Sequence, residues 1–219
     1  MDYVSLGIVG TILFAVIVLF VIVAVLVLTR NRPSGFHGWT ITPEQKLAGM
    51  HGEKIAARAI GSVLRDDDSL FTNVSIEYDG KPAELDNVIV NKYGVFIIEV
   101  KNYTGYIVGN EDDYEWQKYK TTDAGNIYEK TVKNPITQVK RQIYILAKFL
   151  NYYGISVWVR GYALLLHGNS PVDSKYILSD LADIDRKIHT ADRRMLDSKT
   201  VDSIKGLLGQ YGLLQQYHL

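Results

Sequence analysis

Cysteine is absent from the 219 residues, which excludes disulfides within the chain, thiolate metal sites and a cysteine nucleophile. The five histidines are scattered, and no two of them have the spacing of a metal-binding motif such as HExxH. Phosphate-binding loops and nucleophile-elbow motifs are also missing, so nucleoside-triphosphatase and serine-hydrolase functions lack support. No small organic cofactor is therefore expected.

An excess of positive charge is missing as well. When Asp2, Arg30 and Arg32 are set aside, 22 basic and 23 acidic residues remain, which leaves a net charge of −1. A nucleic-acid-binding function therefore requires a local basic patch, because the overall field of the protein offers no attraction.

The N-terminal segment is a long apolar run. Residues 4–28 contain no charged side chain, and as a helix they would extend over about 37 Å, more than the ~30 Å hydrocarbon core of a bilayer. A cleaved signal peptide has a basic start and a shorter apolar run, whereas Asp2 begins this one. We therefore predict that residues 1–30 form a transmembrane helix that is retained as an anchor.

Basic residues lie on one side only of this segment. Arg30 and Arg32 follow it, and no Lys or Arg precedes it. The positive-inside tendency then places the N-terminus outside the cell membrane and the rest of this single-pass protein in the cytoplasm.

Beyond the anchor, three further regions are expected: a juxtamembrane linker (31–41), a main domain (42–166) and a C-terminal extension that packs on the domain (167–219). Apolar periodicity and capping residues predict helices over 42–64, 135–150 and 198–211. Predicted strands cover 73–78, 88–90, 95–98, 103–108, 156–166 and 175–178. The acidic stretch 65–69, RDDDS, lacks the spacing of a metal loop and is interpreted as a solvated turn.

Residues 83–102, AELDNVIVNKYGVFIIEVKN, are predicted to form a hairpin around the turn sequence NKYG. If Val90 pairs with Val95, Asp86 directly faces Glu99. A one-residue bulge at the turn glycine would instead shift the pairing and remove this opposition.

Like charges opposed across a hairpin are destabilising. With an effective dielectric near 20, the repulsion between Asp86 and Glu99 amounts to roughly 3 kcal/mol before screening. A cation between the acids would offset it, and the candidates are Lys101, which lies on the same face, and a divalent metal. In metal-dependent phosphodiester cleavage, carboxylates hold Mg²⁺ against a phosphate oxygen while a lysine positions or polarises the attacking water.

Several motifs in this order resemble those of the nuclease-related domain (NERD) family, a branch of the PD-(D/E)xK nuclease superfamily. They are GMHGE (49–53), ELDNVIVNKYGVFIIEVKN (84–102), Trp116 and NPITQ (134–138). The resemblance covers about Leu47 to Leu166, more than half of the chain. It implies an α/β fold with a restriction-endonuclease-like α-β-β-β-α-β core and a mixed central sheet.

The resemblance also implies residue roles. Asp86, Glu99 and the helix acid Glu53 are implied as ligands of Mg²⁺ or Mn²⁺, Lys101 as the catalytic lysine, and Gln138 as a polar residue aimed at the site from the following helix. Many related nucleases have Gln followed four residues later by Tyr, whereas Gln138 is followed there by Gln142.

Three functions agree with these observations. The first is a membrane-anchored, metal-dependent nuclease that acts on DNA or RNA. The second is a non-catalytic module that binds nucleic acid or protein through Lys140, Arg141 and an aromatic segment that includes Trp116; for these aromatics, packing at the edge of a sheet is the alternative to base stacking. The third is structural: the acids and Lys101 form an exposed salt-bridged ladder, which would contribute only about 0 to 1 kcal/mol.

Overall fold

The computed structural model describes residues 54–122, 124–191 and 193–215. The predicted transmembrane helix (1–30), the linker (31–41) and Glu53 lie outside these ranges. Within them, no helix is both long enough and apolar enough to cross a membrane.

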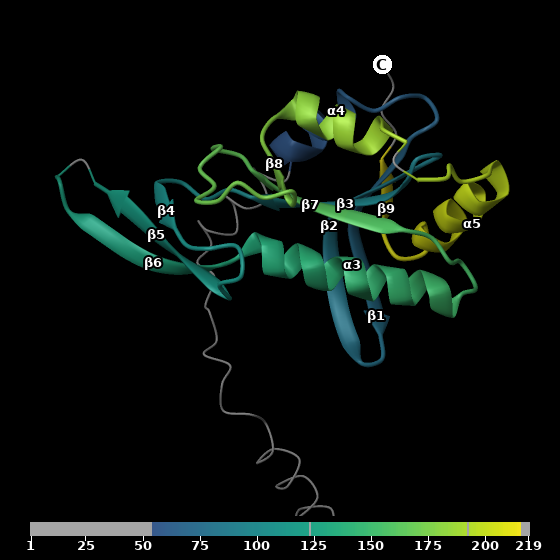
Figure 1. Ribbon diagram of the computed structural model, residues 1–219, viewed down its shortest axis with the longest axis horizontal. Helices are drawn as coiled ribbons and strands as arrows, with labels where there is room; N and C mark the ends of the chain where they lie inside the picture. Colours follow the sequence, from purple (N-terminus) through teal and green to yellow (C-terminus); the bar gives the residue numbers. More distant parts are fainter. Residues whose placement is uncertain (1–53, 123, 192, 216–219) are drawn as a thin grey trace, which may run out of the picture. The chain divides into compact units, whose positions relative to one another are not determined.

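The protein has an α/β fold with two sheets (Figure 1). The larger is a mixed sheet of six strands in the order β8-β7-β3-β2-β1-β9, in which β3, β7 and β8 run parallel and the other neighbours run antiparallel. Its strands are β1 (Ser69–Tyr78), β2 (Lys81–Asn91), β3 (Gly94–Lys101), β7 (Val159–Leu165), β8 (Ile177–Leu178) and β9 (Leu213–Gln215). The smaller, antiparallel sheet contains β4 (Tyr106–Val108), β5 (Glu115–Thr121) and β6 (Ile127–Lys133).

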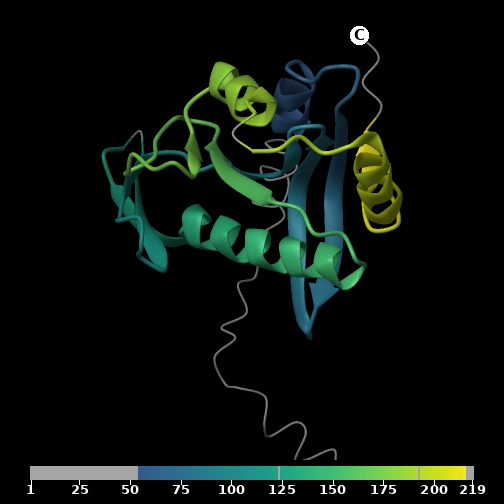
Figure 2. The ribbon, with the colours of Figure 1, turned by 45° about the vertical axis from the view of Figure 1, so that its right-hand side comes forward.

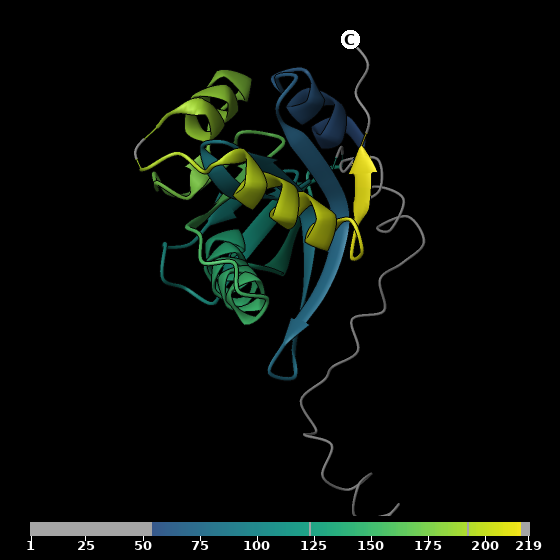
Figure 3. The same cartoon turned by 90° about the vertical axis from the view of Figure 1, so that its right-hand side faces the viewer.

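Helices cover both faces of the large sheet (Figures 2 and 3). On one face, α3 (Pro135–Tyr152) and α5 (Ser198–Leu208) share a core cluster with alternate residues of β1, β2 and β3. On the other face, α4 (Leu181–His189) and the helical residues 54–61 pack on the remaining alternate residues. Because both faces are covered, β3 is buried along its length and carries apolar side chains on both sides.

Helix α3 begins as the sequence predicts. The side chain of Asn134 accepts a hydrogen bond from the Ile136 amide at 2.8 Å, and Pro135 occupies the first turn, where its missing N–H is not needed. Gly161 of β7 lies directly under the helix, and a Cβ there would stand 2.8 Å from side-chain atoms of Val139 and Ile143. Glycine therefore permits the close approach that sets the position of α3 over the sheet.

In both strands of the β1–β2 hairpin, the alternation of side chains between the two faces of the sheet is interrupted at the same paired position. Phe71 and Val74 belong to one core cluster although they are three residues apart, and the same holds for Leu85 and Val88 on the partner strand. Regular alternation would send residues three apart to opposite faces. Asn73, with φ +53°, has the left-handed conformation that makes the change in β1.

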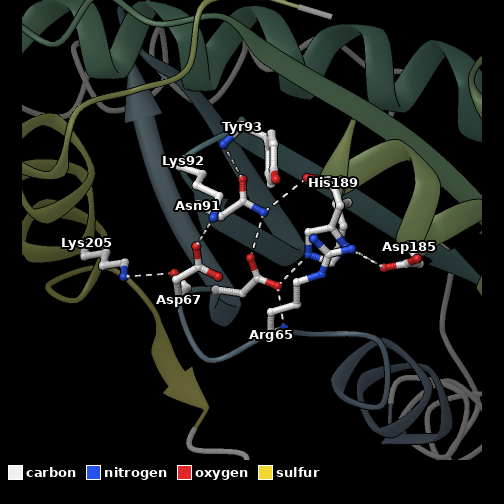
Figure 4. A network of polar contacts seen from close by, with 10 residues as sticks. Arg65, Asp67, Asn91, Lys92, Tyr93, Asp185, His189 and Lys205 are labelled. Atoms are coloured by element: carbon white, nitrogen blue, oxygen red, sulfur yellow. Dashed lines mark hydrogen bonds and ion pairs between the residues drawn. The ribbon is translucent and has the colours of Figure 1, made fainter. Parts of the chain in front are cut away.

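A buried polar network ties the C-terminal part of the protein to the turn between β2 and β3 (Figure 4). The ring of His189 lies between two carboxylates, with Nδ1 2.5 Å from Asp185 and Nε2 2.8 Å from Asp68. Asn91 donates to Asp68 and to the carbonyl of Ile188. The side chain of Asp68 is only 1% exposed, so the prediction of a fully solvated turn over residues 65–69 is wrong at this position.

Most predicted elements are present, and the elements that were not predicted are β5, β6, α4 and the short edge strand β9. The aromatic, charged segment before α3 forms β5 and β6, and α4 lies in a region where only loops were expected. Strands β5 and β6 expose much of both faces, so they have no clear apolar alternation. Helix α4 has nine residues and buries only two aliphatic side chains, Ile184 and Ile188, which is too little for a periodic signal.

Candidate active site

The β2–β3 hairpin has the predicted register. Val90 pairs with Val95 and Asn91 with Gly94, so no bulge interrupts the turn. Regular pairing ends at Asn87 and Ile98, one step before the predicted opposition of the two acids. The acids therefore lie where β2 separates from β3, and they are not an ordinary cross-strand pair.

We call the point where β2 separates from β3 the fork. Here side chains form hydrogen bonds to the backbone of β3 in place of the strand-to-strand bonds. The Asn87 amide donates to the carbonyl of Ile98 at 3.2 Å. The Asp86 carboxylate accepts from the backbone N–H of Val100 at 2.9 Å. Asp86 is thereby fixed beside the end of β3, within electrostatic reach of Lys101.

Glu99 is the most enclosed acid of the fork, with a side chain 2% exposed. Its Oε1 accepts from Lys101 Nζ at 2.5 Å and from Gln138 Nε2 at 2.6 Å. Its Oε2 accepts from Gln142 Nε2 at 2.6 Å. Gln138 and Gln142 are four residues apart on α3, so one face of the helix supplies two donors to one carboxylate.

Lys101 is held as an ammonium ion. Its side chain is 17% exposed, and this burial lowers its pKa, but Glu99, Tyr103 and Asp86 together outweigh that effect and raise the pKa above the ordinary value. Tyr103 has a raised pKa because it is itself buried and lies near Glu99. At neutral pH the site therefore presents a lysine cation next to an un-ionised phenol, whose OH donates to the carbonyl of Lys133 at 3.1 Å.

One oxygen of the site has no hydrogen-bond donor among the residues that the structure describes. Gln142 Nε2 donates both to Glu99 and to the carbonyl of Glu84 at 2.9 Å, which directs Oε1 elsewhere. That Oε1 is buried and accepts no hydrogen bond within the described ranges. An unpaired buried acceptor beside a carboxylate is suited to a cation or to a water molecule.

The two basic residues predicted to bind nucleic acid have different surroundings. Lys140 lies 3.4 Å from both Glu111 and Asp112, so nearby acids already balance its charge. Arg141 is exposed and donates to the carbonyl of Pro82 at 2.7 Å, at the β2 side of the fork. Arg141 therefore borders the site, and Lys140 belongs to a surface ion-pair cluster.

Trp116 cannot stack on a base in this structure. Its side chain is 0% exposed, packs with Ile107, Ile136 and Val139, and donates from Nε1 to the carbonyl of Asn110 at 2.9 Å. The predicted nucleic-acid contact is wrong for this residue. The alternative of packing at the edge of a sheet is not what the structure shows either, because β5 is the central strand of the small sheet and Trp116 packs between that sheet and α3.

The fork thus combines Asp86, Glu99, Lys101 and Gln138, and the matching family model covers all four. The model of the nuclease-related domain matches residues 48–166, more than half of the 219 residues. The chain belongs to this family. In this NERD-family protein the matched region runs from just before the described helical residues to the end of β7, so it includes every element that forms the fork.

The chain is also similar to one protein over a shorter stretch. An uncharacterized protein of Bacillus anthracis is 33% identical over 73 residues, which make up 32% of this chain and 34% of that protein. The similarity thus spans about a third of that relative's length. No solved structure matches this NERD-family chain.

Two residues of the fork were not predicted as site residues. Gln142 contacts Glu99 directly, and its position four residues after Gln138 is the sequence signal that could have identified it. Tyr103 influences Lys101 electrostatically, and it follows Lys101 by two residues. Glu53 lies outside the described residues, and within them no group of three His, Cys, Asp or Glu side chains is arranged to hold a metal.

Proposed function

We propose that this protein is a membrane-anchored, metal-dependent nuclease that hydrolyses phosphodiester bonds of DNA or RNA at the cytoplasmic side of the cell membrane. The observation that carries the proposal is the pairing of Lys101 with buried Glu99, beside Asp86, at the fork between β2 and β3. Membership of the nuclease-related domain family supports it. The anchor and its orientation rest on residues 1–32 of the sequence.

The order of elements supports a restriction-endonuclease-like core and a place in the PD-(D/E)xK superfamily. Helical residues 54–61 precede β1, β2 and β3, and α3 and β7 follow, which is the order α-β-β-β-α-β. The small sheet β4-β5-β6 is inserted between β3 and α3. It leaves the order of the core unchanged.

The donor set of the fork fits a hard divalent cation such as Mg²⁺ or Mn²⁺. Asp86 and Glu99 offer carboxylate oxygens, and Gln142 Oε1 offers a buried amide oxygen without a hydrogen-bond donor in the described part of the chain. Oxygen ligands of this kind are those that Mg²⁺ prefers. Glu53 is the proposed third acid. When bound, the metal would supply Lewis-acid polarisation of a phosphate oxygen and a more acidic bound water.

The residues of the chain have separate tasks in this proposal. Asp86 and Glu99 would hold the cation, and Gln138 and Gln142 hold the Glu99 carboxylate in place by hydrogen bonds. Lys101 remains protonated, so it orients the attacking water and stabilises negative charge on the phosphate; it does not act as the base.

The test is a cleavage assay with the full chain purified in detergent, on single- and double-stranded DNA and on RNA, with Mg²⁺ or Mn²⁺. Asp86→Asn and Glu99→Gln are each expected to reduce the rate by at least about 100-fold, because each removes a charge needed in the transition state. Glu84→Gln is the matched control, since its side chain is exposed on the same strand as Asp86. Equal cleavage by the wild type and both acid variants would refute the proposal.

A second candidate is a non-catalytic binding module. It is favoured by the complete pairing of the Glu99 carboxylate, which accepts from three side chains of its own protein. In that case nucleic-acid binding would survive Glu99→Gln. Calorimetric titration separates the two candidates: heat of Mn²⁺ binding that disappears in Asp86→Asn supports the enzyme, whereas no metal binding in the presence of substrate supports the module.

A further inference from the structure

Strands β5 and β6 gather lysines on one face. Lys118 directly faces Lys130 in the antiparallel register, and Lys120 faces Tyr128 one step further out. Because side chains two residues apart share a face, these three lysines lie together. We call Lys118, Lys120 and Lys130 the lysine face.

Acidic side chains of the same two strands lie on the opposite face. Glu129 pairs with Tyr119, whose OH is 3.4 Å from the Glu129 carboxylate, and Glu115 pairs with Lys133. Apart from Lys133, the basic side chains of β5 and β6 thus lie on the lysine face and the acidic ones on the opposite face, although the chain as a whole carries no net charge. This is the local basic patch that a nearly neutral protein needs for binding nucleic acid.

Lys118 and Lys130 form a like-charge pair across the two strands. Like charges directly opposed on neighbouring strands destabilise a sheet. Lys118, which is half-buried, has a pKa lowered by burial and by the charges of Lys130 and Lys120. A bound polyanion would offset this repulsion, and a stretch of phosphates supplies several negative charges along a line.

The lysine face is connected to the candidate active site by short links. Strand β6 ends at Lys133 and leads through Asn134 into α3, the helix that carries Gln138. Tyr103, two residues after Lys101, donates to the Lys133 carbonyl at 3.1 Å. The sheet that carries the lysine face is thereby joined to the helix that contributes Gln138 and Gln142 to the fork.

We propose that the lysine face binds the phosphate backbone of the nucleic acid whose phosphodiester bond reaches the fork. This inference rests on the proposed function for the identity of the ligand. It assigns backbone binding to Lys118, Lys120 and Lys130, in place of the buried Trp116 and the acid-paired Lys140. Phosphate contacts position a nucleic acid without reading its sequence, so the binding is expected to depend little on base composition.

The test measures binding apart from cleavage. The full chain in detergent is titrated, with EDTA present to prevent metal-dependent cleavage, into fluorescent duplex DNA, single-stranded DNA and RNA over a series of KCl concentrations. Each phosphate contact contributes about 0.9 to the slope of log K against log salt for a duplex and about 0.7 for a single strand. The triple variant Lys118→Gln, Lys120→Gln, Lys130→Gln is expected to lower the magnitude of the slope by about 2 to 3 units.

Two controls keep the result interpretable. Lys199→Gln changes an exposed lysine of α5 and should leave the slope unchanged. The triple variant should also keep or slightly raise the melting temperature, because it removes a like-charge opposition. The larger of the duplex and single-strand slope changes identifies the form of nucleic acid that the lysine face binds.

The proposal is overturned if the wild type binds none of the three nucleic acids, or if the slope stays the same in the folded triple variant. It is also overturned if the three lysines are needed only for binding to phosphatidylserine vesicles, since the face would then bind a membrane surface. A slope change without any metal-dependent cleavage by the wild type would refute the nuclease function and leave the nucleic-acid-binding face intact.

Discussion

Strand β3 has a buried polar cluster at each end, and the two clusters differ in how completely their groups are paired. Near its start, next to the ring of Tyr93, the histidine cluster consists of Asp68, Asp185 and His189. At its end, the glutamate cluster consists of Glu99, Lys101, Gln138 and Gln142. Each cluster contains a buried carboxylate, Asp68 or Glu99, in contact with a nitrogen-bearing side chain, His189 or Lys101.

In the histidine cluster both ring nitrogens have a carboxylate partner. His189 and Asp68 have side chains 3% and 1% exposed, and Asp185, which is 46% exposed, lies at the solvent side of the cluster. The glutamate cluster is incompletely paired, because the nearby Gln142 Oε1 has no hydrogen-bond donor among the described residues. It also reaches solvent through Lys101, whose side chain is 17% exposed. The histidine cluster is typical of a polar contact that stabilises the fold, and the glutamate cluster is typical of a ligand-binding site.

The largest effect on cleavage is expected for Lys101→Met, and the same variant also reports how much the buried ion pair stabilises the fold. Cleavage is expected to fall by about 100- to 1,000-fold, because a fixed charge beside the phosphate is lost. The free energy of unfolding should also fall by about 3 kcal/mol, since Glu99 stays buried without its cation. Steady-state kinetics and urea denaturation measure the two effects.

Lys199→Met is the matched control for this variant, with both quantities expected at wild-type values. A loss of stability of only 0 to 1 kcal/mol in Lys101→Met would fit the exposed ladder that the sequence allowed, and would contradict the buried pair.

His189→Leu should break the other cluster without affecting chemistry. The free energy of unfolding is expected to fall by about 1 to 3 kcal/mol, because the buried Asp68 carboxylate loses a hydrogen-bond partner. Cleavage per folded molecule, measured where the variant is still native by circular dichroism, should match the wild type. A selective loss of cleavage would show that the two ends of β3 are coupled, contrary to the distinction drawn above.

Gln142→Leu tests whether the incompletely paired side chain of the glutamate cluster contributes to metal binding. It leaves Glu99 Oε2 without its donor and removes the unpaired amide oxygen, so affinity for Mn²⁺ is expected to fall by about 10- to 100-fold. Stability should fall by about 1 to 3 kcal/mol, since a buried acceptor loses its partner. Calorimetric titration with Mn²⁺ reports the first quantity, and unchanged affinity would remove Gln142 from the site.

The smallest effect is that of pH near neutrality. The pKa of Lys101 is raised above 10.5, so the stability that its ion pair contributes is fully present below that pH and is lost as pH rises through the folded-state value. The difference in unfolding free energy between wild type and Lys101→Met should therefore stay constant from about pH 7 to 9 and shrink only above about 10.5. A difference that already declines near pH 8 would contradict the charge state assigned to Lys101.

Local patterns predicted the part of the site that lies on the hairpin. The turn sequence NKYG and the valines on either side of it predict the hairpin, and the pairing of Val90 with Val95 is confirmed. The start of α3 at Asn134 and Pro135 is confirmed for the same reason, because a helix cap depends on neighbouring residues. The predicted direct opposition of Asp86 and Glu99 is modified, since the ladder ends one pair earlier.

Contacts between distant residues were beyond such patterns. Asp68 and His189 are 121 positions apart, and the sequence around Asp68 resembles an ordinary acidic turn. The interruption of the alternation at Asn73 likewise occurs in two paired strands at once, so period-two alternation within one strand cannot reveal it.

By itself, the sequence determined the hairpin, the acid and lysine types at its end, and the family to which those motifs belong, because each depends on residues close together in the chain. The structure decided between the two registers that the turn allowed. The tertiary structure decided how completely these groups are paired. It buries Glu99 under two glutamines of α3, places Trp116 in the core and collects three lysines on one face of β5 and β6. Those outcomes depend on which elements pack together, and burial then sets the charge state and the energetic weight of each polar group.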